Sequence, residues 1–448
     1  MKKIKYLVII GLVTISCGIV KAQSITTAMG SFVPGTGENI PPTLTSLGDP
    51  IDVFMDSTGN LYVTEFHRIR KFTVSTGLVT TVAGSGAMGF TGDGSPATNT
   101  GVRMYAPNGV AVDSQGNIYI CDTLNNRIRK VTKSTGIIST IAGNGAGITT
   151  PLGDGGLATA ARLNQPLGIF IDSSDNIYFA DSSSHRVRKI NHATGIITTI
   201  AGTGYYSTIS SDDDLGLATA VNLYYPTDVT MDSSGNLYIT NSGSHNVLKL
   251  NASTQILTRV AGHFDTASYS GDNGLAINAG LNAPRGVVVD NAGNVYFSDR
   301  LNHRIRKVNA STGIITTIVG TGVQGFSPDG TPGVSANINT PEDLFMTNSG
   351  TLYFADRGNN RIRKIESGNL STVSYENTLE AGIYPNPVVD KIHFKAKKDG
   401  LAIIYSSTGS FIKNLQFKKG DNKFNISYLE KGVYLIKIEE KSYKLIKE

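Results

Sequence analysis

The sequence repeats itself six times, and this repetition constrains the fold more than any other feature. Around Asp113 the chain reads PNGVAVDSQGNIYICDTLNNRIRKVTKSTGIISTIAG, and close variants recur on both sides of it. The period is 57 to 60 residues, with equivalent residues at positions 56, 113, 172, 232, 290 and 347. A period of this size is typical of architectures in which each copy is one supersecondary unit packed against its neighbours.

Each copy has the pattern of four short strands. The runs GVAVD, NIYICD, RIRKV and IISTIAG are rich in β-branched and aromatic residues or alternate charged with apolar ones. The segments DSQGN and KSTG between them supply the residues of tight turns. Four antiparallel strands in each of six copies predict an all-β fold, a six-bladed β-propeller, because closing the ring hides sheet edges that an open array would expose.

The repeat also resembles a known family. The pattern P-x-G-V-x-V-D-x-x-G-N-I-Y-x-x-D-x-x-N-H-R-I-R-K-V, followed by T-G-I-I-T-T-I-A-G, is similar to the NHL repeat of β-propeller proteins. The last copy lacks a clear fourth strand, and ITTAMG at Ile25–Gly30 matches ITTIAG of the other copies. We therefore predict a propeller over residues 23–366 whose last blade is closed by Ile25–Gly30. NLSTVSY at Asn369–Tyr375 is the alternative for that edge.

The start of the chain has the pattern of a signal peptide. Lysines precede an apolar run of moderate length in MKKIKYLVIIGLVTISCGIVKAQ, which predicts a signal over residues 1–22 with cleavage between Ala22 and Gln23. A lipoprotein anchored at Cys17 is the alternative, and Thr14 disfavours it. Without the signal only Cys121 remains, so no intramolecular disulfide is expected. No other stretch is long and apolar enough to cross a membrane.

The end of the chain departs from the repeat. Residues 367–380 are polar and predict a linker, and residues 381–448 alternate apolar and lysine-rich strands, which predicts a small Ig-like β-sandwich. This segment resembles the type A C-terminal sorting domain of the type IX secretion system. The resemblance implies that the secretion machinery is a partner and that the protein reaches the cell surface or the medium through the periplasm of a Gram-negative cell. The matching motif residues are Tyr384, Pro385, Asn386, Pro387, Gly432 and Tyr434.

The net charge of +5 does not indicate a nucleic-acid partner. Residues 23–375 hold 23 basic and 26 acidic side chains, so the basic RIRK strings lie in a region that is net acidic. Nucleic-acid binding generally requires a positive field over the whole domain.

An acid ends the second strand of most copies and an arginine begins the third, which predicts a hairpin ion pair. In the fourth copy both positions change together, to Asn241 and Asn246, and the first copy has Glu65 and Arg68. We therefore predict a structural role for these pairs: Asp122 with Arg127, Asp181 with Arg186, Asp299 with Arg304, and Asp356 with Arg361.

Two further recurring polar positions are predicted to be structural. Asn126 and Asn360 replace histidine at one of them, which favours turn residues over metal ligands for His67, His185, His245 and His303. The loops that join the copies each contain one acid, interpreted as a turn residue, with a divalent cation such as calcium as the alternative. These acids are Glu38, Asp93, Asp154, Asp214, Asp272 and Asp329.

Candidate functional residues are those that differ between copies near the inner strand. Gly109, Gly168 and Gly286 alternate there with Asp52, Asp228 and Asp343. The residues just before them include Asn108, Arg285 and Glu342. Together these polar residues predict a ligand-binding rim at the axial mouth. The alternative is that Gly and Asp merely share a tolerance for unusual backbone angles.

The fourth copy departs most from the pattern. It combines Asn241, Asn246 and Leu248 with the acidic run Asp212–Asp214 and with Tyr205, Tyr206, Tyr224 and Tyr225. Contact with a protein or carbohydrate and relaxed drift are both open for this copy.

The chain contains neither a recognisable catalytic triad spacing nor a metal-binding motif. Propeller hydrolases and lyases use histidine at the axial mouth, and no axial histidine is found. We therefore predict a secreted or cell-surface binding protein without catalytic residues, metal site or cofactor. The alternative is a propeller hydrolase or lyase with a divalent metal at the axial rim.

Overall fold

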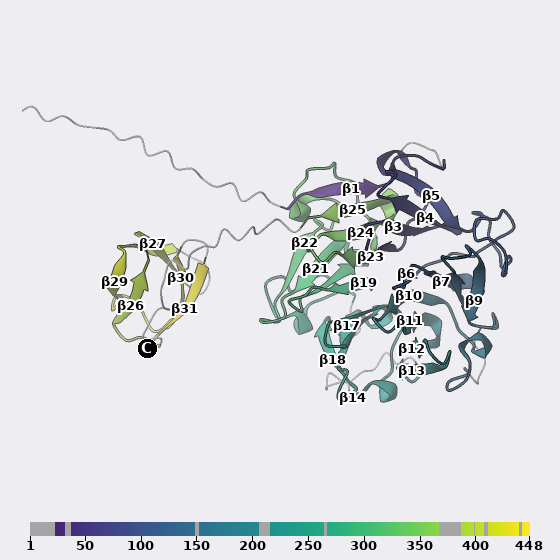
Figure 1. Cartoon of the computed structure of the whole chain (residues 1–448). Helices are drawn as coiled ribbons and strands as arrows, with labels where there is room; N and C mark the ends of the chain where they lie inside the picture. The colour runs from purple at the N-terminus through teal and green to yellow at the C-terminus, as the bar shows by residue number, and fades with distance from the viewer. Residues whose placement is uncertain are drawn as a thin grey trace, which may run out of the picture. The chain divides into compact units, whose positions relative to one another are not determined.

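The computed structural model (Figure 1) describes the chain in two compact units, residues 23–366 and 387–448. Within them it describes residues 23–31, 37–147, 152–205, 216–263, 267–366, 387–397, 399–406, 411–438 and 441–448. The predictions for residues 1–22 with Ala22, for 367–380 with Asn369–Tyr375, and for Tyr384, Pro385, Asn386, Tyr206 and Asp212–Asp214 lie outside these residues.

The first unit consists of six antiparallel sheets, each centred on one repeat. The turns between strands form where the sequence places Asp, Asn and Gly. In sheets 1 to 5 the turn after the first strand is held by its own aspartate, as where Asp113 accepts from the Asn117 backbone N–H at 2.8 Å. Sheet 1 contains β2 (Val53–Met55), β3 (Leu61–Glu65), β4 (Arg68–Thr73) and β5 (Leu78–Ala83). Sheet 2 contains β6 (Val110–Val112), β7 (Ile118–Asp122), β8 (Arg127–Val131) and β9 (Ile138–Ala142). Sheet 3 contains β10 (Pro166–Ile171), β11 (Ile177–Asp181), β12 (Arg186–Ile190) and β13 (Ile197–Ala201).

Sheets 4 to 6 follow the same plan. Sheet 4 contains β14 (Gly216–Leu217), β15 (Pro226–Met231), β16 (Leu237–Asn241), β17 (Asn246–Leu250) and β18 (Ile256–Ala261). Sheet 5 contains β19 (Pro284–Val289), β20 (Val295–Asp299), β21 (Arg304–Val308) and β22 (Ile315–Val319). Sheet 6 contains β23 (Pro341–Met346), β24 (Leu352–Asp356) and β25 (Arg361–Ile365), joined by β1 (Ile25–Met29).

The six sheets form a closed ring (Figure 1). Their first strands, β2, β6, β10, β15, β19 and β23, contact one another in succession, and β23 contacts β2. β1 is the fourth strand of sheet 6, where Ile25 lies opposite Ile365 and Met29 opposite Ile362. The two ends of the repeat region therefore share one sheet, which ties the ring shut.

Apolar side chains fill the spaces between adjacent sheets. The core between sheets 2 and 3, for example, contains Tyr119, Ile128 and Phe179. The outermost strands are covered by the loops that lead into the same sheet, as where Ile40 bridges to Val79 and Leu157 to Ile196. These bridges protect strand edges that would otherwise offer unpaired backbone groups.

Ile25 provides a test of ring closure. It is fully buried in the core of sheets 5 and 6, so Ile25→Ala is expected to lower the free energy of unfolding by about 2–5 kcal/mol. Leu44, which is 61% exposed, is the control, and Leu44→Ala is expected to change it by less than about 0.5 kcal/mol. Urea unfolding measures both. Equal effects of the two variants would show that β1 does not close sheet 6 in solution.

The second unit also consists of strands. β26 (Lys391–Ala396) pairs with β29 (Gly420–Asn425), and a four-stranded sheet contains β28 (Phe411–Phe417), β27 (Gly400–Ser406), β30 (Gly432–Ile438) and β31 (Lys441–Lys447) in that order. Phe394, Ile404 and Phe417 lie in its core. Gly432 begins β30, and the Tyr434 hydroxyl donates to the Glu430 carbonyl at 2.9 Å. Pro387 lies at the start of the unit.

Helical structure is limited to short turns. Ten 3-10 helices of three residues each occur in the described segments, among them η8 (Arg300–Asn302) and η10 (Arg357–Asn359). Over the part of the chain that the structure describes, no helix has the length and apolar character to cross a membrane.

Candidate functional site

The hairpin ion pairs are formed by a different arginine from the predicted one. Asp122 and Arg127 are cross-strand neighbours, but the Asp122 carboxylate binds the Arg129 guanidinium at 3.4 Å. Arg127 instead donates to the carbonyls of Asn125 and Asn144 and lies over the Phe90 ring. Because Arg129 is fully buried and Arg127 is not, the buried cation takes the carboxylate. The same correction applies to the predicted pairs Asp181–Arg186, Asp299–Arg304 and Asp356–Arg361, whose acids pair with Arg188, Arg306 and Arg363.

Each of these buried arginines has a second carboxylate partner in the loop before its sheet. The loop acid Asp154 binds Arg188 at 2.9 Å and also accepts from the Thr199 hydroxyl. The loop acids therefore anchor the connecting loops to the sheets. The other pairs of this kind are Glu38 with Arg70, Asp93 with Arg129, Asp272 with Arg306, and Asp329 with Arg363. Asp214 lies outside the described residues.

Sheet 4 replaces this ionic arrangement with a neutral one. The Asn241 side chain donates to the Asn246 side chain at 3.2 Å, and Leu248 stands where the other sheets have the buried arginine. In the first copy Glu65 pairs with Arg68 at 2.7 Å, as its sequence position suggests. The fourth copy therefore differs from the other copies at three positions, those of Asn241, Asn246 and Leu248, and not only at the first two.

The recurring histidines fasten each hairpin turn to the next sheet. His185, His303 and Asn126 are left-handed turn residues, with φ between 51° and 54°. The ring Nδ1 of His185 accepts the backbone N–H of Tyr225, and Asn126 does the same for Gln165 with its amide oxygen. Four further side chains each accept a backbone N–H of the next sheet in the same way: His67 from Ala106, His245 from Ala283, His303 from Thr340, and Asn360 from Asp49.

This role predicts a pH dependence of stability. Burial lowers the pKa of His67, His185 and His303 below 6.5, because it disfavours the charged imidazolium. The Nδ1 atom of each ring can accept its hydrogen bond only while it is unprotonated. The unfolded chain then binds protons at a higher pH than the folded chain. The histidine contribution is complete above about pH 6.5 and is lost as the pH falls through the folded pKa values.

Asparagine supplies the matched control, since Asn126 and Asn360 do the same work without titrating. A variant with asparagine at positions 67, 185, 245 and 303 is expected to lose less stability than the wild type between pH 7 and pH 5. Thermal unfolding over this range measures the difference. An identical slope in both proteins would contradict the fastener role.

The inner-strand aspartates lie in the interior of the ring rather than on an open rim. Asp52 accepts the backbone N–H of Val110 in sheet 2 at 2.6 Å, and Asp228 accepts that of Val287 in sheet 5 at 2.8 Å. Both side chains are more than 90% buried. They therefore join neighbouring sheets.

The alternation of Gly and Asp has a packing cause. None of the six residues has a positive φ, so the proposed tolerance for unusual backbone angles is wrong. A Cβ atom at Gly168 would lie 2.1 Å from a carboxylate oxygen of Asp228, and one at Gly286 would lie 2.3 Å from Asp343. Glycine in one sheet makes room for the aspartate of the next. Gly109 is pressed in the same way against the Leu167 carbonyl.

The three aspartates influence one another. Burial raises the pKa of Asp52, and a hydrogen bond with Asp343 lowers it in part, so that the pKa of Asp52 is about 6. Burial and the neighbouring carboxyl groups raise the pKa of Asp228 and Asp343 well above the ordinary value. The three carboxyl groups therefore retain their protons to a higher pH than ordinary aspartates do. Burial also raises the pKa of the Cys121 thiol, which keeps this core residue unreactive.

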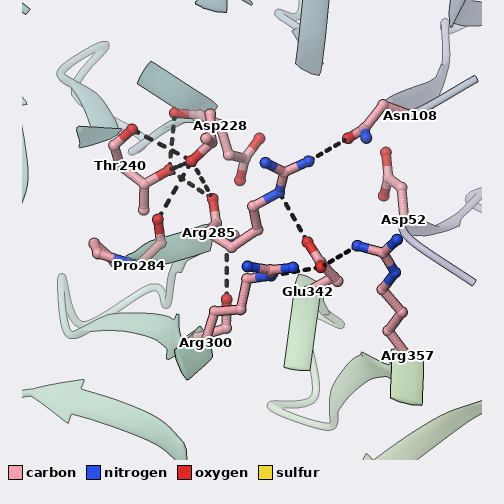
Figure 2. A network of polar contacts seen from close by, with 12 residues as sticks. Asp52, Asn108, Asp228, Thr240, Pro284, Arg285, Arg300, Glu342 and Arg357 are labelled. Atoms are coloured by element: carbon pink, nitrogen blue, oxygen red, sulfur yellow. Dashed lines mark hydrogen bonds and ion pairs between the residues drawn. The ribbon is translucent and has the colours of Figure 1, made fainter. Parts of the chain in front are cut away.

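Arg285, Glu342 and Asn108 do come together, with two arginines that the sequence analysis did not single out (Figure 2). Glu342 is fully buried, and its carboxylate binds Arg285 at 2.8 Å, Arg300 at 2.6 Å and Arg357 at 2.9 Å. Burial alone would raise the pKa of Glu342, but the three guanidinium groups outweigh it and lower the pKa. We call these five residues the axial network.

The axial network joins sheets that are not neighbours. Arg285 of sheet 5 donates to the Asn108 amide oxygen of sheet 2 at 3.4 Å, while Glu342 belongs to sheet 6. The hydroxyls of Thr227 and Thr240 both bind the Arg285 carbonyl, at 2.9 and 2.6 Å, which fixes its backbone. Figure 2 shows these contacts around the Arg285 side chain.

Comparison of the copies could have found the two missed arginines. The residue after the second full strand is Thr123, Ser182 and Ser242 in sheets 2 to 4, but Arg300 and Arg357 in sheets 5 and 6. Thr123 and Ser182 donate their hydroxyls to the carbonyls of Pro166 and Pro226. Arg357 forms two further contacts with Asp49, at 2.6 and 2.8 Å, which together with Glu342 raise the pKa of Arg357.

The remaining candidates of the fourth copy do not join the axial network. Tyr205 is 77% exposed, and the Tyr225 hydroxyl donates to Gln165. Tyr224 lies beside His185, with ring centroids 5.7 Å apart. A groove of about 610 Å³ between sheets 1 and 2, lined by Phe54, Val82 and Val112 among others, also contains none of the axial residues.

Family models match both parts of the chain. The Teneurin NHL domain matches residues 147–269 and 263–325, and the NHL repeat matches residues 104–131. The repeat region between residues 104 and 325 therefore matches NHL-repeat family models. The Secretion system C-terminal sorting domain matches residues 382–448, which indicates export to the cell surface or into the medium.

Similar proteins were found among curated sequences and solved structures. The chain is 28% identical over 268 residues to Protein SUPPRESSOR OF QUENCHING 1, chloroplastic, of Arabidopsis thaliana, covering 58% of this chain and 25% of that protein. It is 28% identical over 416 residues to Teneurin-4 of Mus musculus, covering 86% of this chain and 14% of that protein. The chain thus spans a quarter or less of these relatives.

A solved structure supports the fold. An auxiliary nutrient binding protein from Bacteroides thetaiotaomicron aligns with a TM-score of 0.55 at 19% identity, covering 77% of this chain and 76% of that chain. At this identity the likeness concerns the fold alone.

Proposed function

We propose that this protein is exported through the type IX secretion system and acts as a secreted or cell-surface binding protein. The binding site would be the axial network and the loops next to it. The observation that carries the proposal is that side chains which break the repeat, Arg285, Arg300, Arg357 and Glu342, meet at one place. Positions that only hold the fold together keep the same contacts in most sheets.

We infer the finer architecture as follows. The six sheets would be the six blades of a propeller spanning residues 23–366, after a signal peptide over residues 1–22 cleaved between Ala22 and Gln23. Residues 367–380 would be a linker, and residues 381–448 an Ig-like sandwich recognised by the secretion machinery through Tyr384, Pro385, Asn386, Pro387, Gly432 and Tyr434.

The chemistry of the axial network favours binding over proton transfer. Three arginines hold Glu342 ionised, so it is a poor general acid, and guanidinium groups do not titrate near neutral pH. Asp52 and Asp228 are occupied by backbone N–H groups. Among the described residues, no three His, Cys, Asp or Glu side chains are arranged to hold a metal ion, so the hydrolase or lyase alternative gains no support from this geometry.

A binding array tests the proposal. Residues 23–448 are applied to arrays of glycans and surface proteins, beside a variant with Arg285→Thr and Arg300→Ser, residues that sheets 4 and 3 have at the same positions. Specific binding by the wild type, lost in the variant, is the expected result. Binding that the variant retains in full would refute the axial site.

A further inference from the structure

The ion pairs of the axial network contain one more positive than negative group. Its three arginines face two carboxylates, Glu342 within the network and Asp49 beside it. Among the described residues, Asp52, Asp228 and Asp343 form no ion pair with these three arginines. The end of the ring at this point is therefore suited to an anion.

The unused hydrogen-bond donors belong mainly to Arg300. Glu342 accepts hydrogen bonds from Nε of Arg300 and Nη1 of Arg357 and forms an ion pair with Nε of Arg285. Asp49 accepts from the other two donor groups of Arg357. The two terminal nitrogens of Arg300 bind no described protein atom, while its side chain is 27% exposed. Arg285 has one such nitrogen, and its contact with Asn108 is long, at 3.4 Å.

The position of Arg300 is fixed before any ligand arrives. Glu342 holds its Nε at 2.6 Å, which leaves the pair of terminal nitrogens as the remaining edge of the planar guanidinium. Two parallel N–H groups on such an edge match the two oxygens of a carboxylate, and an ammonium group does not provide this fork. A single surplus charge suits a monoanion better than a dianion such as phosphate.

We propose that the ligand of this protein carries a carboxylate group, which binds the terminal nitrogens of Arg300 with support from Arg285. This inference rests on the proposed function and names the chemical class of its ligand. Arg300 has no counterpart in sheets 2 to 4, where Thr123, Ser182 and Ser242 occupy the position, so the fold itself does not require arginine there.

Calorimetric titration with D-glucuronate and D-glucose tests the proposal on residues 23–448, because the two sugars differ in the carboxylate alone. D-glucuronate is expected to bind the wild type, and D-glucose is expected to bind at least about tenfold more weakly. Arg300→Ser is expected to weaken D-glucuronate binding about tenfold or more, and Arg300→Lys is expected to recover only part of it. Arg259→Thr, which removes one positive charge from the outer strand of sheet 4, is expected to bind as the wild type does.

Three results would overturn the proposal. These are equal binding of the two sugars, unchanged D-glucuronate binding by Arg300→Ser with a native circular dichroism spectrum, and tighter binding of inorganic phosphate than of D-glucuronate. The proposed function can survive each of them, because an array ligand of another class would still require Arg285 and Arg300. The broader proposal fails on a different result, which is array binding that the variant with Arg285→Thr and Arg300→Ser retains in full.

Discussion

Asp181→Ala is expected to lower the free energy of unfolding by about 3–5 kcal/mol, since it leaves the fully buried Arg188 without its buried carboxylate. The backbone N–H of Asn164, which donates to Asp181 at 2.7 Å, loses its acceptor as well. Although Asp154 still binds Arg188, it is 43% exposed and compensates only in part. Urea unfolding at pH 7.5 measures the change.

Sheet 4 of the same chain shows a set of residues that should avoid this loss of stability. Sheet 4 has Asn241, Asn246 and Leu248 in place of the acid and the two arginines. The triple variant Asp181→Asn, Arg186→Asn, Arg188→Leu copies that set into sheet 3 and is expected to recover most of the lost stability, because no buried charge remains. A triple variant as unstable as Asp181→Ala would show that charge burial is not the cause.

Glu342→Gln is expected to lower the free energy of unfolding by about 3 kcal/mol, because three arginines that are 17% to 30% exposed would face one another without their shared anion. The loss is expected to be smaller at high salt, since ions screen the repulsion between these partly exposed groups. Urea unfolding at low and high salt measures both effects.

Asp49→Asn is the matched control for Glu342→Gln. Asp49 binds Arg357 at 2.6 Å but is 42% exposed, so its loss is expected to cost no more than about 1 kcal/mol. An effect of Asp49→Asn as large as that of Glu342→Gln would mean that burial of Glu342 does not set the strength of the axial network.

The repeat predicts the strands well because tight turns and alternating strands leave local patterns. It could not identify the arginine that receives the hairpin acid. Arg127 and Arg129 are two residues apart on one strand and so face the same side of the sheet. The choice between them depends on burial, and burial is set by the neighbouring sheet and by the loop that contains Asp93.

The axial residues illustrate the same limit. Differences between copies identified Asp52, Asp228, Glu342 and Arg285, but the sequence does not distinguish an aspartate that binds a backbone N–H of the next sheet from one that faces solvent. Contacts between sheets, such as that of Asp228 with Gly168, exist only once the ring has closed. Arg300 was missed because its turn is remote in sequence from the inner strand.

The central claim, that ligands bind where the repeats differ, is tested most directly by hydrogen–deuterium exchange on the wild-type chain with the ligand selected by the array. The claim predicts that protection on binding is concentrated in residues 282–286, 299–303, 341–343 and 356–360. Protection confined to the turns at the far ends of the strands, such as residues 113–117, or to residues 387–448, would contradict it.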